Sequence, residues 1–198
     1  MSKIVVSQFI TLDGVVEDPG GSENHRYGGW AFQFERGPDG DKFKLDELMA
    51  SDALLLGRVT FEGFAAAWPT REGDFADKFN TMPKYVVSST LENPEWNNST
   101  VIGVDDIAGL RDRHEGDILV NGSVQLVQGL IARGLVDEYR LMVFPVVLGS
   151  GKKLFADDGV RQPLSVVESR PAGEVVILRL EPKAVSYTHL TLPTILRV

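Results

Sequence analysis

The stretch "GDILVNGSVQLVQGLIARGLVDEYRLMVF", residues 116–144, decides the fold. A short hydrophobic run at 118–120 is followed by apolar residues at helical spacing from 123 to 134, and then by a second hydrophobic run. This order predicts a strand, a helix and another strand. Because a helix of about ten residues carries the chain back across a sheet, the two strands are expected to run parallel in one helix-covered sheet.

The same alternation of strand and helix signals extends over most of the chain. Before residue 116, strands are expected at 3–10, 53–57 and 83–90. Helices are expected in the same part of the chain at 39–52, 58–68, 74–82 and 105–114. The strand that closes the quoted stretch is expected to continue to residue 149, and 163–171 and 174–183 are expected to form a terminal antiparallel hairpin. The sequence therefore predicts one α/β domain with a mostly parallel mixed sheet and helices on both faces.

Composition limits the classes of function. The chain has 198 residues, a formal charge of -8, three scattered histidines and no cysteine, so disulfides, thiolate metal sites and cysteine nucleophiles are excluded and no metal is expected. An acidic chain is a poor partner for nucleic acid or an anionic membrane. Without an apolar run of roughly 18 residues or a signal peptide, the protein is expected to be cytoplasmic and to act on a small molecule.

The last residues of the chain differ from the rest in their sequence pattern. The segment 184–198 has no periodicity and follows a strand that is already complete. Its ten residues "VSYTHLTLPT" (185–194) back-translate into a sequence that looks like adaptor read-through from a transposase-based library. We expect a domain at 1–183 and a non-native, disordered tail at 184–198, with a natural disordered tail as the alternative.

Polar groups follow three of the predicted strands, where ligands bind in open α/β sheets. The first polar group is Gly57, Arg58 and Thr60, the second is Ser88 and Ser89, and the third is Asn121, Gly122 and Ser123. The first and third groups also open helices, whose N-terminal N–H groups favour an anion. Each group alone is compatible with an ordinary cap or turn. Three of them on successive strands point to a shared binding edge.

The turn "GSGK" at 149–152 has the glycines and the lysine of a phosphate-binding loop but not its spacing. Such a loop needs a glycine five residues before the Gly-Lys pair and Ser or Thr after it, whereas Val146 and Lys153 occupy these places. The turn therefore needs another explanation.

Five segments resemble, in order and spacing, the dihydrofolate-reductase-like family that includes the reductase domain of riboflavin biosynthesis and small stand-alone bacterial members. They are "TLDGVVEDPGG", "LLLGRVTFEGFAAAWP", "PKYVVSSTL", "GDILVNGSVQLVQGLIARGLVDEYRL" and "PVVLGSGKKLF". The resemblance covers about residues 3–182 and implies a three-layer fold, NADPH as cofactor and a homodimer. It also implies that the glycines at 149–151 only turn the chain, that Lys152 and Lys153 are surface charges and that Phe155 enters the core.

Residue roles follow from the same resemblance. It places the first polar group beside the cofactor phosphates, the second at the adenosine 2'-phosphate, and the third over the pyrophosphate and nicotinamide, although folate reductases have two adjacent glycines where this chain has Gly122 and Ser123. Asp13 and Gly14 match a mobile loop that closes over nicotinamide and substrate. These residues are the expected cofactor and substrate contacts.

Reduction also needs a proton, and Asp13 and Asp41 are the candidate donors. Asp41 lies sixteen positions before Gly57, a separation that matches the substrate-side acid of folate reductases, but it could instead cap a helix. Asp13 could instead order its own loop through an Asx turn. Trp30 and Trp68 are candidates to wall a planar substrate, with core packing as the alternative.

The resemblance implies NADPH-dependent hydride transfer to a small heterocyclic or ribityl-type metabolite, like the reduction of 5-amino-6-(5-phosphoribosylamino)uracil. One departure weakens that particular substrate, because the loop at 13–29 offers only His25 and Arg26 as cations for a ribose phosphate. Two alternatives stay open. The chain could be a nucleotide-binding sensor or structural partner without catalysis, or it could be a dihydrofolate reductase.

Overall fold

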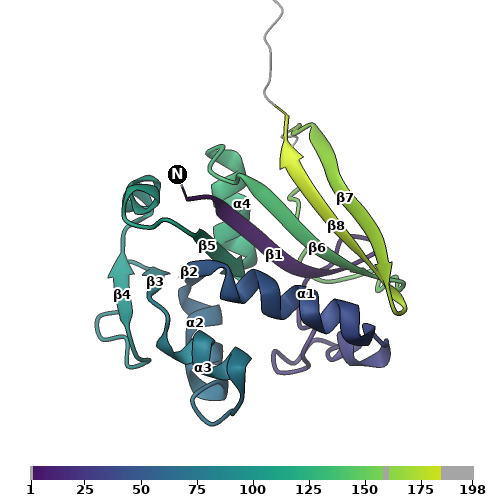
Figure 1. Cartoon of the computed structure of the whole chain (residues 1–198), viewed down its shortest axis with the longest axis horizontal. Helices are drawn as coiled ribbons and strands as arrows, with labels where there is room; N and C mark the ends of the chain where they lie inside the picture. Colours follow the sequence, from purple (N-terminus) through teal and green to yellow (C-terminus); the bar gives the residue numbers. More distant parts are fainter. Residues whose placement is uncertain (1, 158–160, 184–198) are drawn as a thin grey trace, which may run out of the picture.

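The computed structural model describes residues 2–157 and 161–183, so the predicted tail at 184–198 lies outside the described residues. Eight strands form one sheet in the order β4-β3-β2-β5-β1-β6-β8-β7. Along the chain the strands are β1 (Ile4–Thr11), β2 (Ser51–Gly57), β3 (Lys84–Val87), β4 (Ser99–Ile102), β5 (Asp117–Asn121), β6 (Glu138–Phe144), β7 (Leu164–Ala172) and β8 (Val175–Pro182). Figure 1 shows the sheet twisting from β4 at one edge to β7 at the other.

The pairing confirms the predicted mixed sheet. The six strands from β4 to β6 are parallel, and β8 and β7 close the sheet as antiparallel partners. The quoted stretch forms β5, helix α4 (Val124–Ala132) and β6, with β1 inserted between the two strands. Strand β4 was not predicted, because only its four β-branched and polar residues "STVI" mark it.

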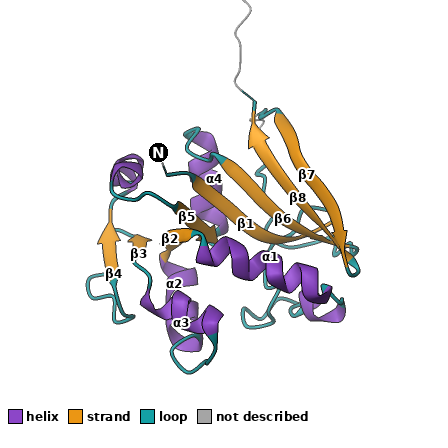
Figure 2. Ribbon diagram, viewed as in Figure 1, coloured by secondary structure: helices purple, strands orange, loops and turns teal. Residues whose placement is uncertain are grey.

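Helices cover the sheet on both faces, as predicted (Figure 2). On one face lie α4 and the short 3-10 helices η2 (Val104–Asp106) and η3 (Ala108–Asp112), which replace the single helix predicted at 105–114. The other face carries α1 (Gly37–Met49), α2 (Arg58–Ala67) and α3 (Asp74–Thr81). Strand β1 shows why both faces are buried: Ile4 and Val6 pack toward α4, whereas Val5 packs toward α1 and α2.

The segment after β6 corrects two predictions. The strand ends at Phe144 rather than at residue 149, because Pro145 has no N–H for the ladder and the Val146 N–H turns back to the Phe144 carbonyl (2.8 Å). After the turn, Leu154 enters the core with no exposed surface, and Phe155 stays 40% exposed. The residue that anchors this segment is therefore Leu154.

The glycines of the same segment turn the chain, as expected. Gly149 and Gly151 have φ angles of 75° and 126°, which side chains disfavour. A Cβ on Gly151 would lie 2.6 Å from the Val15 side chain. Close packing of this turn against the loop after β1 therefore requires glycine. In the described part of the chain, no helix is both long and apolar enough to cross a membrane.

Candidate functional site

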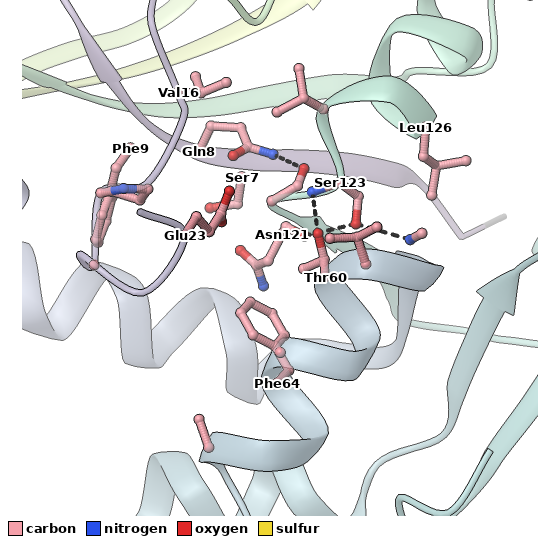
Figure 3. Close-up of a pocket in the computed structure, with 18 of the residues that line it drawn as sticks. Ser7, Gln8, Phe9, Val16, Glu23, Thr60, Phe64, Asn121, Ser123 and Leu126 are labelled. Carbon is pink, nitrogen blue, oxygen red and sulfur yellow. Dashed lines mark hydrogen bonds between the residues drawn. The ribbon is translucent and has the colours of Figure 1, made fainter. Parts of the chain in front are cut away.

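A cleft of about 2090 Å³ runs along the carboxyl ends of the parallel strands, and all eight residues of the three polar groups line it. Figure 3 shows Ser7, Gln8, Thr60 and Asn121 converging on this space from β1, α2 and β5. The volume exceeds the roughly 300–1,000 Å³ of a typical single-ligand site. The cleft therefore has room for a dinucleotide and a second small molecule together.

Hydrogen bonds tie the first and third polar groups to each other. The Ser123 hydroxyl accepts from the Gly57 N–H (2.9 Å), and the Thr60 hydroxyl accepts from the Ser123 N–H (2.9 Å). From β1, the Gln8 amide donates to the Gly122 carbonyl (2.6 Å). The ends of β2 and β5 and the middle of β1 are thus held in one arrangement before any ligand arrives.

The turn between β5 and α4 depends on its residue types. Gly122 has a φ of 58°, and a Cβ there would lie 3.0 Å from the Thr60 methyl group. Ser123 also has a positive φ of 54°, which is uncommon for a side-chain-bearing residue. Its two hydrogen bonds to the first polar group stabilise that conformation. This local strain lies at the strand end that the resemblance assigns to the pyrophosphate and nicotinamide.

The first polar group differs in detail from the expected cap. Helix α2 begins at Arg58, so Thr60 lies inside the first turn and contacts α4 rather than capping its own helix. The Arg58 guanidinium pairs with Glu62 (3.0 Å), and both side chains are about half exposed. Arg58 therefore remains accessible from the cleft, but it shares its charge with a carboxylate.

The second polar group follows β3, which lies next to β2 with Gly57 opposite Val87. The Ser88 hydroxyl accepts from the Thr90 and Leu91 N–H groups (3.1 and 3.0 Å), which makes it a turn-forming residue. Ser89 lines the cleft beside it. Because β2 and β3 are adjacent, Arg58 and Ser89 can contact the same anionic group.

Charge in the cleft differs from charge on the whole chain. The chain carries 28 acidic and 20 basic residues, whereas the cleft is lined by six of each. The basic ones are Arg36, Lys44, Arg58, Arg71, Arg133 and Lys152, and the acidic ones are Glu17, Asp18, Glu23, Asp41, Glu72 and Asp74. An anionic ligand therefore meets less repulsion here than the net charge suggests.

Three predicted site residues lie outside the residues that line the cleft, which corrects their assignment. Asp13 accepts from the Thr11 hydroxyl (2.6 Å) and the Gly149 N–H (2.7 Å), and these bonds hold its pKa below the usual range. It clamps two loops together and is not placed to protonate a substrate. Gly14, with φ 83°, supports the same clamp through its carbonyl, which accepts from Leu154.

The third of these residues, Trp30, is a core residue. It is 1% exposed, packs edge-on against Phe144 and donates from its indole to the Glu17 carbonyl (2.8 Å). The core-packing alternative is therefore the right one for Trp30. Trp68 does line the cleft, where it stacks on Phe75.

Asp41 lies in the cleft wall but is not the helix cap that was its alternative. It is inside α1, its side chain is 65% exposed, and it pairs with Arg36 (2.9 Å). Lys152 is a surface charge, as expected, with its side chain 56% exposed, and it also lines the cleft, where it pairs with Glu17 (2.5 Å). His25 and Arg26 are not among the lining residues.

Sequence reasoning missed a cluster of Ser7, Lys44 and Glu47 at the cleft, which we call the Lys44 cluster. Ser7 comes from β1, and Lys44 and Glu47 come from α1. The Lys44 ammonium donates to the Ser7 hydroxyl (2.6 Å) and to Glu47, and Ser7 donates to the same Glu47 oxygen (2.7 Å). The polar pair Ser7 and Gln8 inside the hydrophobic run of the first strand was the one signal for it.

The residues present fit a dinucleotide. Adjacent strand ends offer an arginine, the first backbone N–H groups of two helices, which no side chain of the described residues caps, and small side chains that let phosphates approach. Among the described residues, no group of three or more His, Cys, Asp or Glu side chains could hold a metal ion.

This fold and cleft define a dihydrofolate-reductase-like α/β protein. The chain belongs to the RibD C-terminal domain family, whose model matches residues 2–178. YyaP of Bacillus subtilis strain 168, an uncharacterized protein, is 31% identical over 183 residues, which cover 88% of this chain and 92% of YyaP. YwjB of the same organism, also uncharacterized, is 27% identical, over 89% of this chain and 95% of YwjB.

Solved structures agree on the fold. A protein from Shewanella sp. PV-4 described as a riboflavin biosynthesis protein superposes with a TM-score of 0.72 at 20% identity, over 92% of this chain and 99% of that one. RibD of Acinetobacter baumannii gives 0.62 at 15% identity, over 93% of this chain and 59% of RibD. Dihydrofolate reductase of Enterococcus faecalis, solved in complex with NADP(H), superposes with a TM-score of 0.57 at 17% identity. The match covers 92% of this chain and 97% of the reductase. These likenesses show that the chain shares the fold of RibD and of dihydrofolate reductase.

Proposed function

We propose that the protein is an NADPH-dependent reductase of a small carbonyl- or imine-containing heterocycle. One observation carries the proposal: all three polar groups, which are far apart in the sequence, line the same cleft at adjacent strand ends. The E. faecalis reductase of the same fold was solved with NADP(H), which supports this choice of cofactor. When bound, NADPH supplies the hydride, and the protein supplies position and electrostatics.

Each part of the cleft has a separate task in this proposal. The first and second polar groups hold the phosphates through Arg58, Ser89 and the N–H groups that open α2. The third polar group holds the reactive end of the cofactor, because β5 lies between β2 and β1 in the middle of the sheet. The rest of the cleft, bounded by β1, α1 and the loop after β1, takes the substrate.

A direct assay tests the proposal. Purified protein is incubated with NADPH and either a dihydropterin or a pyrimidine ribosylamine phosphate, and the loss of nicotinamide absorbance is followed. Turnover of one of the two is expected. Binding of NADPH without turnover of either compound would favour a sensor of the same fold, and failure to bind NADPH would overturn the proposal altogether.

A matched variant checks that turnover arises in this cleft. Gly122→Val introduces a branched side chain at a left-handed position in contact with Thr60, so it should reduce NADPH affinity at least tenfold. Gly134→Val changes a left-handed glycine that has open space around it, at the far end of α4, and serves as the control for strain alone. Equal effects of the two variants would show that the cofactor does not bind beside Gly122.

A further inference from the structure

The Lys44 cluster contains an ion pair that is largely shielded from solvent. The Glu47 side chain is 3% exposed, the Lys44 side chain 15%, and Ser7 2%. The free energy needed to remove two charges from water can exceed the attraction between them, and two well-packed apolar side chains are often as stabilising as a buried ion pair. The cluster therefore calls for an explanation other than stability.

Its hydrogen bonds are incomplete on the cleft side. An ammonium group has three N–H donors, and within the described part of the chain Lys44 uses two of them, to Ser7 and Glu47. Ser7 and Lys44 line the cleft, whereas Glu47 lies behind them, and its second oxygen has no partner among the described residues. Glu47 thus holds the ammonium from behind and leaves one donor for a ligand.

The sheet order places the cluster next to the reactive end of the cofactor site. The strands β3, β2, β5 and β1 are neighbours in this order. The second, first and third polar groups follow β3, β2 and β5, and the Lys44 cluster lies at the next strand, β1. Ser7 is the direct partner of Asn121 in the β1–β5 register. A dinucleotide that extends from the second group to the third therefore ends beside Lys44.

We propose that Lys44 binds the heteroatom of the reducible C=O or C=N group and donates a proton to it. This rests on the function proposed above. The hydride forms the new C–H bond, the π electrons move to the oxygen or nitrogen, and that atom takes a proton from the Lys44 ammonium. Lys44 is left as a neutral amine, which regains its proton from water after the product leaves. Glu47 and Ser7 act as positioning residues.

The acids that α1 and the loop after β1 bring to the cleft are less suited to this task. Asp41 is paired with Arg36, Glu17 with Lys152, and Asp18 accepts from the Glu23 and His25 N–H groups. Glu23 is the rival donor, because its carboxyl lines the cleft and burial, with the nearby Asp18 charge, raises its pKa. It lies on the loop after β1, outside any helix or strand, whereas the Lys44 cluster is tied to β1 and α1.

Binding to the cofactor-free protein gives a readout that does not depend on turnover. Uracil, lumazine and pterin serve as carbonyl heterocycle probes, and their affinities are measured by protein-detected NMR, with the Lys44 side-chain nitrogen signal followed. At least one probe should bind and shift this signal, and Lys44→Met should weaken its binding at least tenfold. Lys42→Met, on the exposed side of the same helix, is the matched control and should leave binding unchanged.

Because Lys44→Met leaves Glu47 buried without its counter-charge, the double variant Lys44→Met/Glu47→Gln is made as well. It removes both charges and keeps a hydrogen-bond acceptor for Ser7. It should fold, bind NADPH within about twofold of the unmodified protein, and lower kcat by roughly a hundredfold or more, the usual contribution of a general acid. Glu47→Gln alone should lower kcat less than the double variant does.

Three results would overturn the role of Lys44: no probe binds, Lys44→Met leaves probe binding unchanged, or Glu23→Gln abolishes turnover while the double variant retains it. The proposed function fails separately, through the absence of NADPH binding in the unmodified protein. The two proposals are therefore distinguishable in one set of proteins.

Discussion

At the scale of single residues, the proposed function makes the choice between NADPH and NADH depend on Arg58 and its neighbours. A guanidinium and hydroxyls around a 2'-phosphate gain charge-assisted hydrogen bonds of roughly 1.5–3 kcal/mol each. We therefore expect NADPH to bind well ahead of NADH. Arg58→Ala should weaken the binding of NADPH about tenfold to a hundredfold and have little effect on the binding of NADH. Ser89→Asp should reduce the difference between the two affinities further, because its carboxylate repels the 2'-phosphate. Titration of both cofactors against the three proteins at fixed salt measures this.

Glu62 provides the control for this prediction. It pairs with Arg58 one helical turn away, so Glu62→Gln frees the guanidinium and should leave NADPH affinity unchanged or raise it. If Arg58→Ala weakened NADPH and NADH alike, the adenosine end of the cofactor would lie elsewhere in the cleft.

At the scale of elements, Lys84 on β3 joins the end of α3 to the loop before β4. Its ammonium is fully buried and donates to the carbonyls of Asn80, Met82 and Asn97 at 2.8–3.0 Å, while it lies 4.4 Å from the Trp96 ring centre. Burial lowers the pKa of Lys84 to about 8, so the group is still charged at pH 7. A lysine here satisfies carbonyls at the end of α3 that no apolar side chain could satisfy.

Lys84→Met should therefore lower the free energy of unfolding at pH 7 by about 2–4 kcal/mol, because three carbonyls lose their donor. Lys42→Met is the matched control, since it removes an exposed i,i+4 pair with Asp46 that is worth about 0.5 kcal/mol or less. Urea unfolding of both variants measures the difference. Equal stability of the two would mean that the three carbonyls find other partners.

At the scale of the whole molecule, Glu138 links the parallel part of the sheet to its antiparallel hairpin. Arg140 on β6 lies directly opposite Arg179 on β8, a like-charge pair that would destabilise the pairing. The Glu138 carboxylate, 1% exposed, accepts from both at 2.8 Å and from Lys3 at 3.2 Å. Burial alone would raise its pKa, but hydrogen bonds and charge from Arg140 and Arg179 outweigh burial and lower it to about 2.

A carboxyl with a lowered folded-state pKa stabilises the protein above its ordinary value of 4.5, and this contribution is lost as the pH falls toward about 2. It amounts to about 3 kcal/mol at neutral pH. Glu138→Gln should lower the free energy of unfolding at pH 7 by about this amount. Between pH 5 and pH 2 the free energy of unfolding should then fall less steeply than in the unmodified protein. Glu181→Gln, which removes a half-exposed partner of Lys3, is the control. The free energy of unfolding is measured with urea between pH 5 and pH 2. If it fell equally steeply for Glu138→Gln and the unmodified protein, Glu138 would not be the group that titrates.

The sequence alone determined the order of most elements, the mixed sheet and the three polar groups that line the cleft. These signals are local: periodicity reports which face of a segment is buried, and the first and third polar groups each lie at one strand end next to one helix start. Parallel strands then bring such ends to one edge, so the residues that line it follow from the strand assignment. Strand β4, with four residues, was too short for the same reasoning.

Only the tertiary structure decided which side chains form the Lys44 cluster. Ser7 and Lys44 are separated by 37 residues, and they meet because α1 packs across β1, which no short-range pattern encodes. Packing also placed Trp30 in the core and turned Asp13 toward the Gly149 N–H, because both depend on the path of the loop after β1. The direction in which a side chain points across two distant segments is set by how those segments pack, and that is a property of the folded chain.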